Sequence, residues 1–537
     1  MSDQAWFVAA MVIYLIAMIF IGMLGYKQTD EYEDYMLGGR NLHPFVAALS
    51  AGASDMSGWL LMGLPAAIFV SGFSELWVAI GLLAGSALNW WFTAPRLRAY
   101  TEVANNSITV PSFLENRLED RTHILRVASG LVILLFFTFY VASGMVAGGR
   151  YFESTFDSSY AVGIIIIAGV TVIYTFVGGF LAVSYTDAVQ GCIMFISLLL
   201  VPIFALVHMQ NPGDIFNFQL ENAYAASGIE PNPHWFSLFN GVGFITIISG
   251  LAWGLGYFGQ PHIIVRFMAL RSPKDSRQGM AYGVTWMALS MVGTVFVAII
   301  GPAFFTENPN IEIVDQINFE TIFLDMGQIL FHPLIAGLVL TAVLAAIMST
   351  ISSQLLVVSS ALVEDIYKGL FNKNASDSLL KLLSRIAVLV VALIAALVAA
   401  KPDSAVLGLV EFAWAGFGSA FGPVIVATLY WRRLNAPGAA AGLIAGAVVS
   451  FLWGGLANFG IMDKPFGLYE MIPGVIANVV FMVGVSLATK PPKQSVLDTF
   501  DKAVKLQNAT QDDPELSFSE AETCLLYTSD AADDTPC

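Results

Sequence analysis

Residues 49–65 read LSAGASDMSGWLLMGLP, an apolar stretch in which Asp55 is the only charge. Four poor helix formers surround this carboxylate, namely Gly52, Ser54, Ser57 and Gly58. A stretch of this kind can unwind within a membrane and present carbonyl oxygens to a cation and N–H groups to an anion. The alternative is a Gly/Ser helix-packing face on which Asp55 is merely hydrogen-bonded. We favour the functional interpretation because a carboxylate so deep in a span is costly.

The composition requires a membrane around most of the chain. Of the 537 residues, 57% are hydrophobic and 12% are charged, and the mean hydropathy is +0.72. A soluble protein could not keep such a surface in water, so we expect membrane lipids to surround it. The net charge of −16 argues against a nucleic-acid partner, which would require a basic face.

The spans can be located from their length, because a helix needs about 20 mostly apolar residues to cross the bilayer. Each span must be helical, except where protein or a cavity covers a break. The sequence predicts an all-α polytopic protein with about thirteen transmembrane helices: 5–26, 44–72, 75–95, 125–149, 160–179, 187–208, 237–260, 282–304, 331–362, 383–400, 404–430, 437–459 and 468–489.

The basic residues predict the orientation of these helices. With the N-terminus outside and the helices alternating, the outside loops keep three of the 24 basic residues, Arg150, Lys401 and Lys464. The other 21, Lys27 among them, then fall in the inside loops and the C-terminal segment. Cytoplasmic loops carry an excess of Lys and Arg, so this bias indicates an N-out, C-in protein.

The seventh span contains a second interruption, SGLAWGLGYFGQP at residues 249–261. Its spacing of glycines fits G-x-G-x-x-G, but no strand precedes it and no βαβ unit surrounds it, which argues against a dinucleotide site. A broken helix fits better. The rings of Trp253 and Tyr257 then either enclose a small apolar body or ammonium group, or pack as ordinary core aromatics.

The ninth span carries a cluster of hydroxyl groups at Ser349, Thr350, Ser352 and Ser353. Hydroxyls in membrane helices often bond back to the preceding turn. They are also hard oxygen donors that suit Na⁺ together with backbone carbonyls. From these residues alone, the two interpretations are equally well supported. The broken second span favours ion binding.

Two interrupted helices, five spans apart, suggest two repeats. A repeat with an odd number of helices forces the halves into opposite orientations, as in many secondary transporters. We therefore expect five segments: a first helix and loop (1–43), a first repeat of helices 2–6 (44–208), a second repeat of helices 7–11 (209–430), helices 12 and 13 (431–489), and an acidic, disordered cytoplasmic tail (490–537).

Two further charged residues are functional candidates. Asp187 opens the predicted sixth span, and we favour an N-terminal cap and helix-dipole partner over a direct role. Arg40 directly precedes the second span. It is either a basic anchor at the cytoplasmic face or a participant in the cytoplasmic exit of an ion.

Several of these motifs together resemble the sodium:solute symporter family. They are YMLGGR (35–40), SAGASDMSGWLLMGLP (50–65), FYVASGMVAGGR (139–150), GGFLAVSYTDAVQG (178–191), WGLGYFGQPHI (253–263) and AAIMSTISSQLLV (345–357). The resemblance is collinear from about residue 5 to 490. It implies a LeuT-type fold, in which one helix precedes a five-plus-five inverted repeat and two helices follow it.

The resemblance also implies two binding sites. A sodium ion would be bound between the second and ninth helices by the carbonyls of Ala53, Met56 and Ala346 and the hydroxyls of Ser349 and Thr350, with support from Asp55. The solute would be bound by Ser57, Gly58, Trp59, Tyr140, Trp253, Tyr257 and Pro261.

The function implied by this resemblance is sodium-coupled uptake of L-proline across the bacterial inner membrane by alternating access. The chain would not be an enzyme and would use no organic cofactor. A symporter for another solute, such as a sugar, pantothenate or acetate, is the main alternative. A membrane sensor or a channel of the same fold is a third. The acidic segment of about fifty residues after the last predicted helix is too short for a signalling domain, which disfavours the sensor.

Overall fold

The computed structural model describes residues 3–26, 36–177, 179–216, 232–308, 310, 313–315, 318–400, 405–458, 461 and 464–508. Within these ranges the regular structure is helical, and an isolated bridge between Leu42 and Leu270 is the only strand-type pairing. Lys27 and Lys401, which entered the orientation argument, lie outside the described residues, as do residues 509–537.

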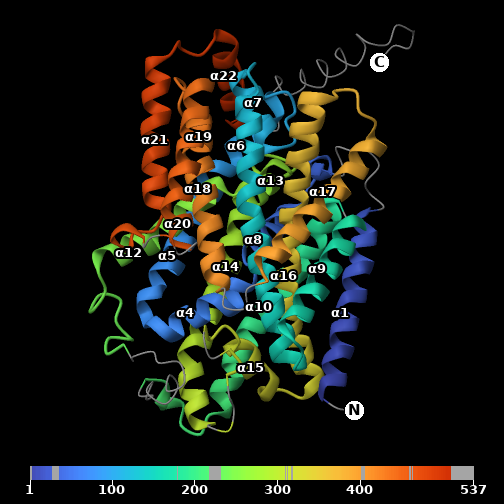
Figure 1. Cartoon of the computed structure of the whole chain (residues 1–537), viewed down its shortest axis with the longest axis vertical. Helices are drawn as coiled ribbons and strands as arrows, with labels where there is room; N and C mark the ends of the chain where they lie inside the picture. Colours follow the sequence, from blue (N-terminus) through green and yellow to red (C-terminus); the bar gives the residue numbers. More distant parts are fainter. Residues whose placement is uncertain are drawn as a thin grey trace.

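The long helices lie side by side along the long axis of the molecule (Figure 1). They are α1 (Asp3–Tyr26), α8 (Ile124–Phe156), α9 (Tyr160–Val177), α10 (Phe180–His208), α14 (Asp275–Glu307), α16 (Pro333–Ser360), α17 (Asp377–Val398), α18 (Val406–Tyr430), α19 (Ala436–Ser450) and α21 (Met471–Ala488). The short helices α6 (Ala94–Val103), α7 (Val110–Leu118) and α22 (Gln494–Asn508) lie toward one end, and α15 (Ile322–Leu330) lies toward the other.

Ten helical stretches among the described residues are long and apolar enough to cross a membrane, and two shorter apolar helices accompany them. Each of the thirteen predicted spans contains helix, but the count of thirteen crossings stays a prediction. Large aliphatic side chains such as Ile165 and Val207 are exposed on the outer surface, at 69% and 74%. Lipid tails can cover such side chains where water cannot.

Both predicted helix interruptions are present. The second span divides into α3 (Pro44–Asp55), the π-helical turn η2 (Trp59–Gly63) and α4 (Leu64–Ser71). The seventh span divides into α12 (Phe244–Ala252), the 3₁₀ segment η6 (Trp253–Gly259) and α13 (Pro261–Met268). Proline stands at the first turn of both α3 and α13, where its missing N–H costs nothing.

Glycines allow the broken seventh span to lie directly on its neighbours. A Cβ on Gly85 of α5 (Leu76–Leu88) would lie 2.1 Å from the Gly254 carbonyl oxygen of η6. A Cβ on Gly256 would lie 2.0 Å from Nε1 of Trp414 in α18. Small residues let membrane helices approach this closely. The interrupted segment is therefore fixed between α5 and α18.

The helix boundaries require two corrections to the predicted spans. Helix α10 begins at Phe180, so Asp187 lies two turns inside the helix and does not cap it. The seventh span begins at Phe244, later than predicted, and continues through α13 to Met268. Helix α10 extends seven residues before the predicted span, whereas the predicted seventh span includes loop residues before α12. Hydropathy alone therefore misplaces both boundaries.

The segment after residue 490 is not wholly disordered, because residues 494–508 form α22. Phe500 of this helix packs between two guanidinium groups, with Arg96 5.2 Å and Arg117 5.5 Å from its ring centroid. Nζ of Lys493, just before the helix, lies 2.8 Å from Glu119 at the end of α7. These contacts dock α22 against α6 and α7, so this part of the prediction is wrong.

Candidate functional site

The break after Asp55 frees a backbone carbonyl. In a continuous helix the Ser57 N–H would bond the Ala53 carbonyl, but it bonds the Asp55 carbonyl instead, at 2.9 Å. Met56 leaves the helical conformation at φ −80° and ψ 78°. The Ala53 oxygen, buried in the protein, therefore needs another partner.

Hydroxyl groups of α16 supply that partner. Ser349 Oγ donates to the Ala53 carbonyl at 2.7 Å and lies 3.1 Å from the Ala346 carbonyl of its own helix. Thr350 Oγ1 lies 3.4 Å from the same Ala53 oxygen. Four of the oxygen atoms predicted as sodium ligands thus gather at the contact between α3 and α16. Met56 is buried directly beyond them in the break.

Asp55 contributes its backbone and its side chain to different neighbours. Its carbonyl accepts hydrogen bonds from Tyr140 Oη and Trp59 Nε1, both at 3.0 Å. Its carboxylate accepts a hydrogen bond from Tyr257 Oη of η6. Asp55 therefore ties the broken second span to α8 and to the broken seventh span. The carboxylate has no contact with Ser349 or Thr350 among the hydrogen bonds of the described residues.

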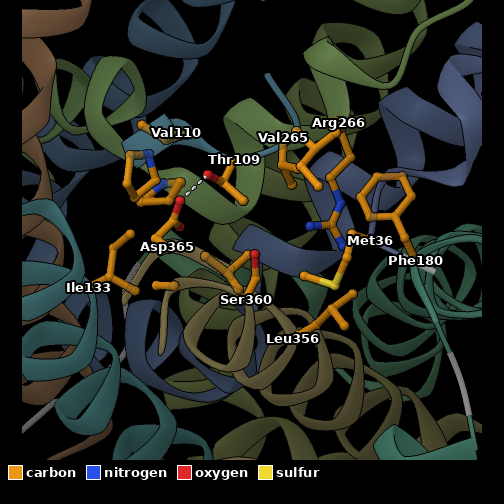
Figure 2. Close-up of a pocket in the computed structure, with 15 residues that line it drawn as sticks. Met36, Thr109, Val110, Ile133, Phe180, Val265, Arg266, Leu356, Ser360 and Asp365 are labelled. Carbon is orange, nitrogen blue, oxygen red and sulfur yellow. Dashed lines mark hydrogen bonds between the residues drawn. The ribbon is translucent and has the colours of Figure 1, made fainter. Parts of the chain in front are cut away.

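The residues predicted to bind the solute divide into groups. Five of them gather around the Asp55 break: Ser57, Gly58, Trp59, Tyr140 and Tyr257. Trp253 stacks on Tyr469 with ring centroids 5.4 Å apart, and its carbonyl accepts a hydrogen bond from Trp414 Nε1 at 2.7 Å. Pro261 begins α13 and lines a different pocket, drawn in Figure 2.

The pocket in Figure 2 lies between α7, α8, α10, α13 and α16. Arg266 and Asp365 lie on opposite sides of it, among mostly apolar side chains such as Phe180 and Leu356. The Thr109 hydroxyl at the start of α7 donates to Asp365 at 2.7 Å. Arg40 lies at the C-terminal end of α13, because its guanidinium donates to the Met268 carbonyl at 3.0 Å.

Arg40 also donates to the Ser107 carbonyl at 2.8 Å and to Thr101 Oγ1 at 3.0 Å. It thus joins the loop before α3 to the α6–α7 connection and to α13. This geometry is compatible with either role predicted for Arg40.

Asp187 forms a buried network that the sequence did not reveal. Its carboxylate lies 3.2 Å from Nη2 of Arg266, and both side chains are 0% exposed. Ser50 of α3 donates to the carboxylate at 2.8 Å, and Ser353 of α16 does so at 3.2 Å. The prediction of a helix cap is therefore wrong, because Asp187 instead joins four helices of the core.

Arg266 is one of the 21 basic residues that the orientation argument assigns to the inside loops and the C-terminal segment, but it lies within α13. The signal available in the sequence was its position five residues after Pro261, which can begin a new helix after the break. Asn89 was also missed. It begins the π-helical turn η4 (Asn89–Thr93), and its Nδ2 donates to the Tyr257 carbonyl at 2.9 Å.

Comparisons with known proteins found relatives that match most of the chain. A high-affinity proline transporter of Bacillus subtilis, PutP, is 51% identical over 484 residues, covering 90% of this chain and 98% of that protein. A sodium/proline symporter of Salmonella typhimurium is 49% identical over 491 residues, covering 91% and 95%. The sodium/proline symporter of Escherichia coli is 47% identical with the same coverage.

Among solved structures, a Na⁺-coupled sialic acid symporter in a substrate-bound, outward-open state matches with a TM-score of 0.75 and 21% identity, covering 91% of this chain and 99% of that one. This likeness establishes the LeuT-type fold. The model of the sodium:solute symporter family matches residues 35–446, which include both broken helices and the α16 hydroxyls. The chain is therefore a multi-pass bacterial inner-membrane protein that belongs to the sodium:solute symporter family.

Proposed function

We propose that this protein couples the inward movement of sodium to the uptake of L-proline by alternating access. The observation that carries the proposal is the gathering of the Ala53 carbonyl with the Ser349 and Thr350 hydroxyls at the break in the second span. Uncharged oxygens of this kind suit a hard monovalent cation. Relatives at about half identity over nine-tenths of the chain carry names that specify proline.

In this proposal, sodium replaces the hydroxyl hydrogens as the partner of the Ala53 carbonyl and joins α3 to α16. Ordering the break orients the N–H groups near Ser57 and Gly58 toward a carboxylate ligand, as at other helix N-termini. Each ligand then lowers the cost of ordering the site for the other, and this coupling is reciprocal. The aromatic side chains Tyr140 and Tyr257, both buried beside Asp55, supply apolar surface for the pyrrolidine ring.

The energy for accumulation comes from the ion. Moving one positive charge inward releases about 2.3 kcal/mol per 100 mV of membrane potential. With one sodium per proline, that term alone supports roughly fiftyfold accumulation.

The test is uptake of labelled proline into proteoliposomes of the purified protein, with and without an inward sodium gradient. We expect saturable, sodium-dependent uptake that unlabelled proline suppresses and that a sugar, pantothenate or acetate does not. If one of those other solutes were itself taken up in a sodium-dependent way and proline were not, the protein would be a symporter for that solute with the same ion site. Uptake that neither saturates nor responds to sodium would favour a channel and contradict the proposal.

A further inference from the structure

Two arginines lie beneath the C-terminal helix α22, at the end of the molecule that the orientation assigns to the cytoplasm. Arg96 belongs to α6 and Arg117 to α7, and both helices contact α22 (Figure 1). The ring of Phe500 in α22 is buried against both guanidinium groups, with its centroid 5.2 Å from Cζ of Arg96 and 5.5 Å from Cζ of Arg117. This ring therefore covers a place where two positive charges lie close to each other.

Arg117 is almost completely buried, at 1% exposure. Its Nη1 donates to the Val496 carbonyl at 3.2 Å, and its Cζ lies 5.0 Å from the centroid of the Tyr100 ring. Its Nε is buried without a hydrogen-bond partner, as is Nε of Arg96. A carbonyl and ring faces are uncharged, so they do not compensate the charge of the guanidinium. A buried charge without an opposite charge is costly, and this position therefore favours an anion.

The described part of the chain supplies no carboxylate partner to either arginine. The ion pairs among the described residues all involve other cations. Arg266 provides a direct comparison, because it is equally buried and pairs with Asp187 at 3.2 Å. Asp501 of α22 pairs with the exposed Arg432 at 2.8 Å instead of with the two covered arginines. The counter-charge of these arginines therefore has to come from a ligand.

The surroundings of Arg96 face the membrane interface. Cζ of this half-buried arginine lies 4.3 Å from the centroid of the Tyr430 ring. The Tyr430 hydroxyl donates to the Phe92 carbonyl at 2.7 Å, and the side chains of Tyr430 and Trp91 are both exposed. Exposed Tyr and Trp side chains at the end of membrane helices are typical of the headgroup layer. Arg96 therefore lies at the depth of lipid phosphates.

We propose that Arg96 and Arg117 form a binding site for a phosphoryl group at the cytoplasmic surface. Guanidinium groups bind phosphate oxygens through paired N–H donors. The headgroup of an anionic phospholipid and free phosphate both carry this chemistry. Position favours the lipid, because basic pockets on the cytoplasmic side of membrane proteins bind such headgroups. The inference does not depend on the transported solute, since neither arginine belongs to the predicted ion or solute site.

Helix α22 should compete with the headgroup for this site. Because Arg117 is buried, a headgroup reaches it only if part of its cover moves, and the Phe500 ring is a part that contacts both arginines. Just before the helix, Lys493 pairs with Glu119 at 2.8 Å, but this pair is largely exposed and contributes little. Headgroup binding is therefore coupled to the docking of α22, and removal of the Phe500 ring should strengthen it.

The test measures lipid binding to the purified protein by native mass spectrometry. The protein is titrated with phosphatidylglycerol in detergent that contains an excess of phosphatidylcholine, and the bound lipids are identified by mass. Wild type is compared with Arg96→Gln, Arg117→Gln and Phe500→Ala. The matched control is Arg271→Gln, because Arg271 carries the same charge near α6 but is 42% exposed and pairs with Asp275. A parallel competition with inorganic phosphate tests the free ion.

Wild type should retain phosphatidylglycerol in preference to phosphatidylcholine. Arg96→Gln and Arg117→Gln should each weaken the binding of phosphatidylglycerol about tenfold, the factor expected for a lost hydrogen bond to a charged group. Arg271→Gln should leave it within roughly twofold of wild type. Phe500→Ala should strengthen it severalfold, and a general loss of folding could not produce that gain.

Equal binding of phosphatidylglycerol by wild type and both arginine variants would overturn the site. An equal loss in Arg271→Gln would also overturn it, because the attraction would then be a general effect of positive charge. Weaker binding in Phe500→Ala would contradict the competition, since α22 would then be part of the site and not its cover. Displacement of the lipid by inorganic phosphate would support the site and assign it to the free ion.

Discussion

Removal of either partner of the buried ion pair between Asp187 and Arg266 should strongly destabilise the core, because the other charge is then left without compensation. Both side chains are 0% exposed, and Oδ2 of Asp187 lies 3.2 Å from Nη2 of Arg266. The guanidinium also donates to Ser50 at 3.1 Å, to Ser353 at 2.6 Å and to the His262 carbonyl at 2.5 Å. Removing the guanidinium by Arg266→Met leaves the carboxylate with two hydroxyl donors and no opposing charge.

The magnitude follows from the separation. At an effective dielectric constant of about 20, two unit charges at this distance attract each other by roughly 5 kcal/mol. Breaking one partner of a buried pair typically costs about 3–5 kcal/mol, because the other charge is left uncompensated. We expect Arg266→Met to lower the free energy of unfolding by about that amount. The double variant Asp187→Asn/Arg266→Met should lose at least about 2 kcal/mol less than the sum of the single changes.

The assay is denaturant-induced unfolding of the purified protein in detergent micelles, followed by tryptophan fluorescence, for wild type, both single variants and the double variant. The matched control is Arg432→Met. Arg432 lies 2.8 Å from Asp501, but the two side chains are 54% and 49% exposed. That variant should lose less than about 1 kcal/mol. Strictly additive single effects at Asp187 and Arg266 would refute the reasoning, because they would mean that the two charges do not stabilise each other.

Three further outcomes are expected. Thr350→Ala should raise the sodium concentration for half-maximal uptake roughly tenfold. The control Ser359→Ala removes a hydroxyl that bonds back to its own helix and should leave that concentration unchanged. Equal effects of the two substitutions would contradict the ion site. Phe500→Ala should speed amide hydrogen exchange across residues 494–508, because the helix loses its contact with two guanidinium groups, and unchanged exchange would mean that this ring does not hold α22. Tyr469→Leu should weaken proline binding severalfold and leave sodium binding unchanged, because Tyr469 stacks on Trp253. Wild-type proline affinity in this variant would mean that Trp253 does not belong to the solute site.

The sequence could predict those features of the fold that depend on local composition. Apolar runs of sufficient length must be helices in a membrane, so the existence of the spans followed directly. The clusters of glycine and serine near Asp55, and of glycine near Trp253, weaken a helix wherever they occur, and both breaks are present. The hydroxyl cluster of Ser349, Thr350, Ser352 and Ser353 was also visible, because hydroxyl groups stand out in an apolar helix. The family resemblance singled out Ser349 and Thr350 as sodium ligands, and that assignment stays a prediction.

The pairings between helices were decided only by the tertiary structure. Asp187 and Arg266 are 79 positions apart, and Asp55 and Tyr257 are 202 apart. Whether such side chains meet depends on the rotation of each helix about its axis and on its depth, and packing against neighbouring helices sets both. Hydropathy does not report either quantity, which is why Asp187 looked like a helix cap and Arg266 like a loop residue. For the same reason the sequence did not reveal the partner of Asp55, whose carboxylate accepts a hydrogen bond from Tyr257 in the folded protein.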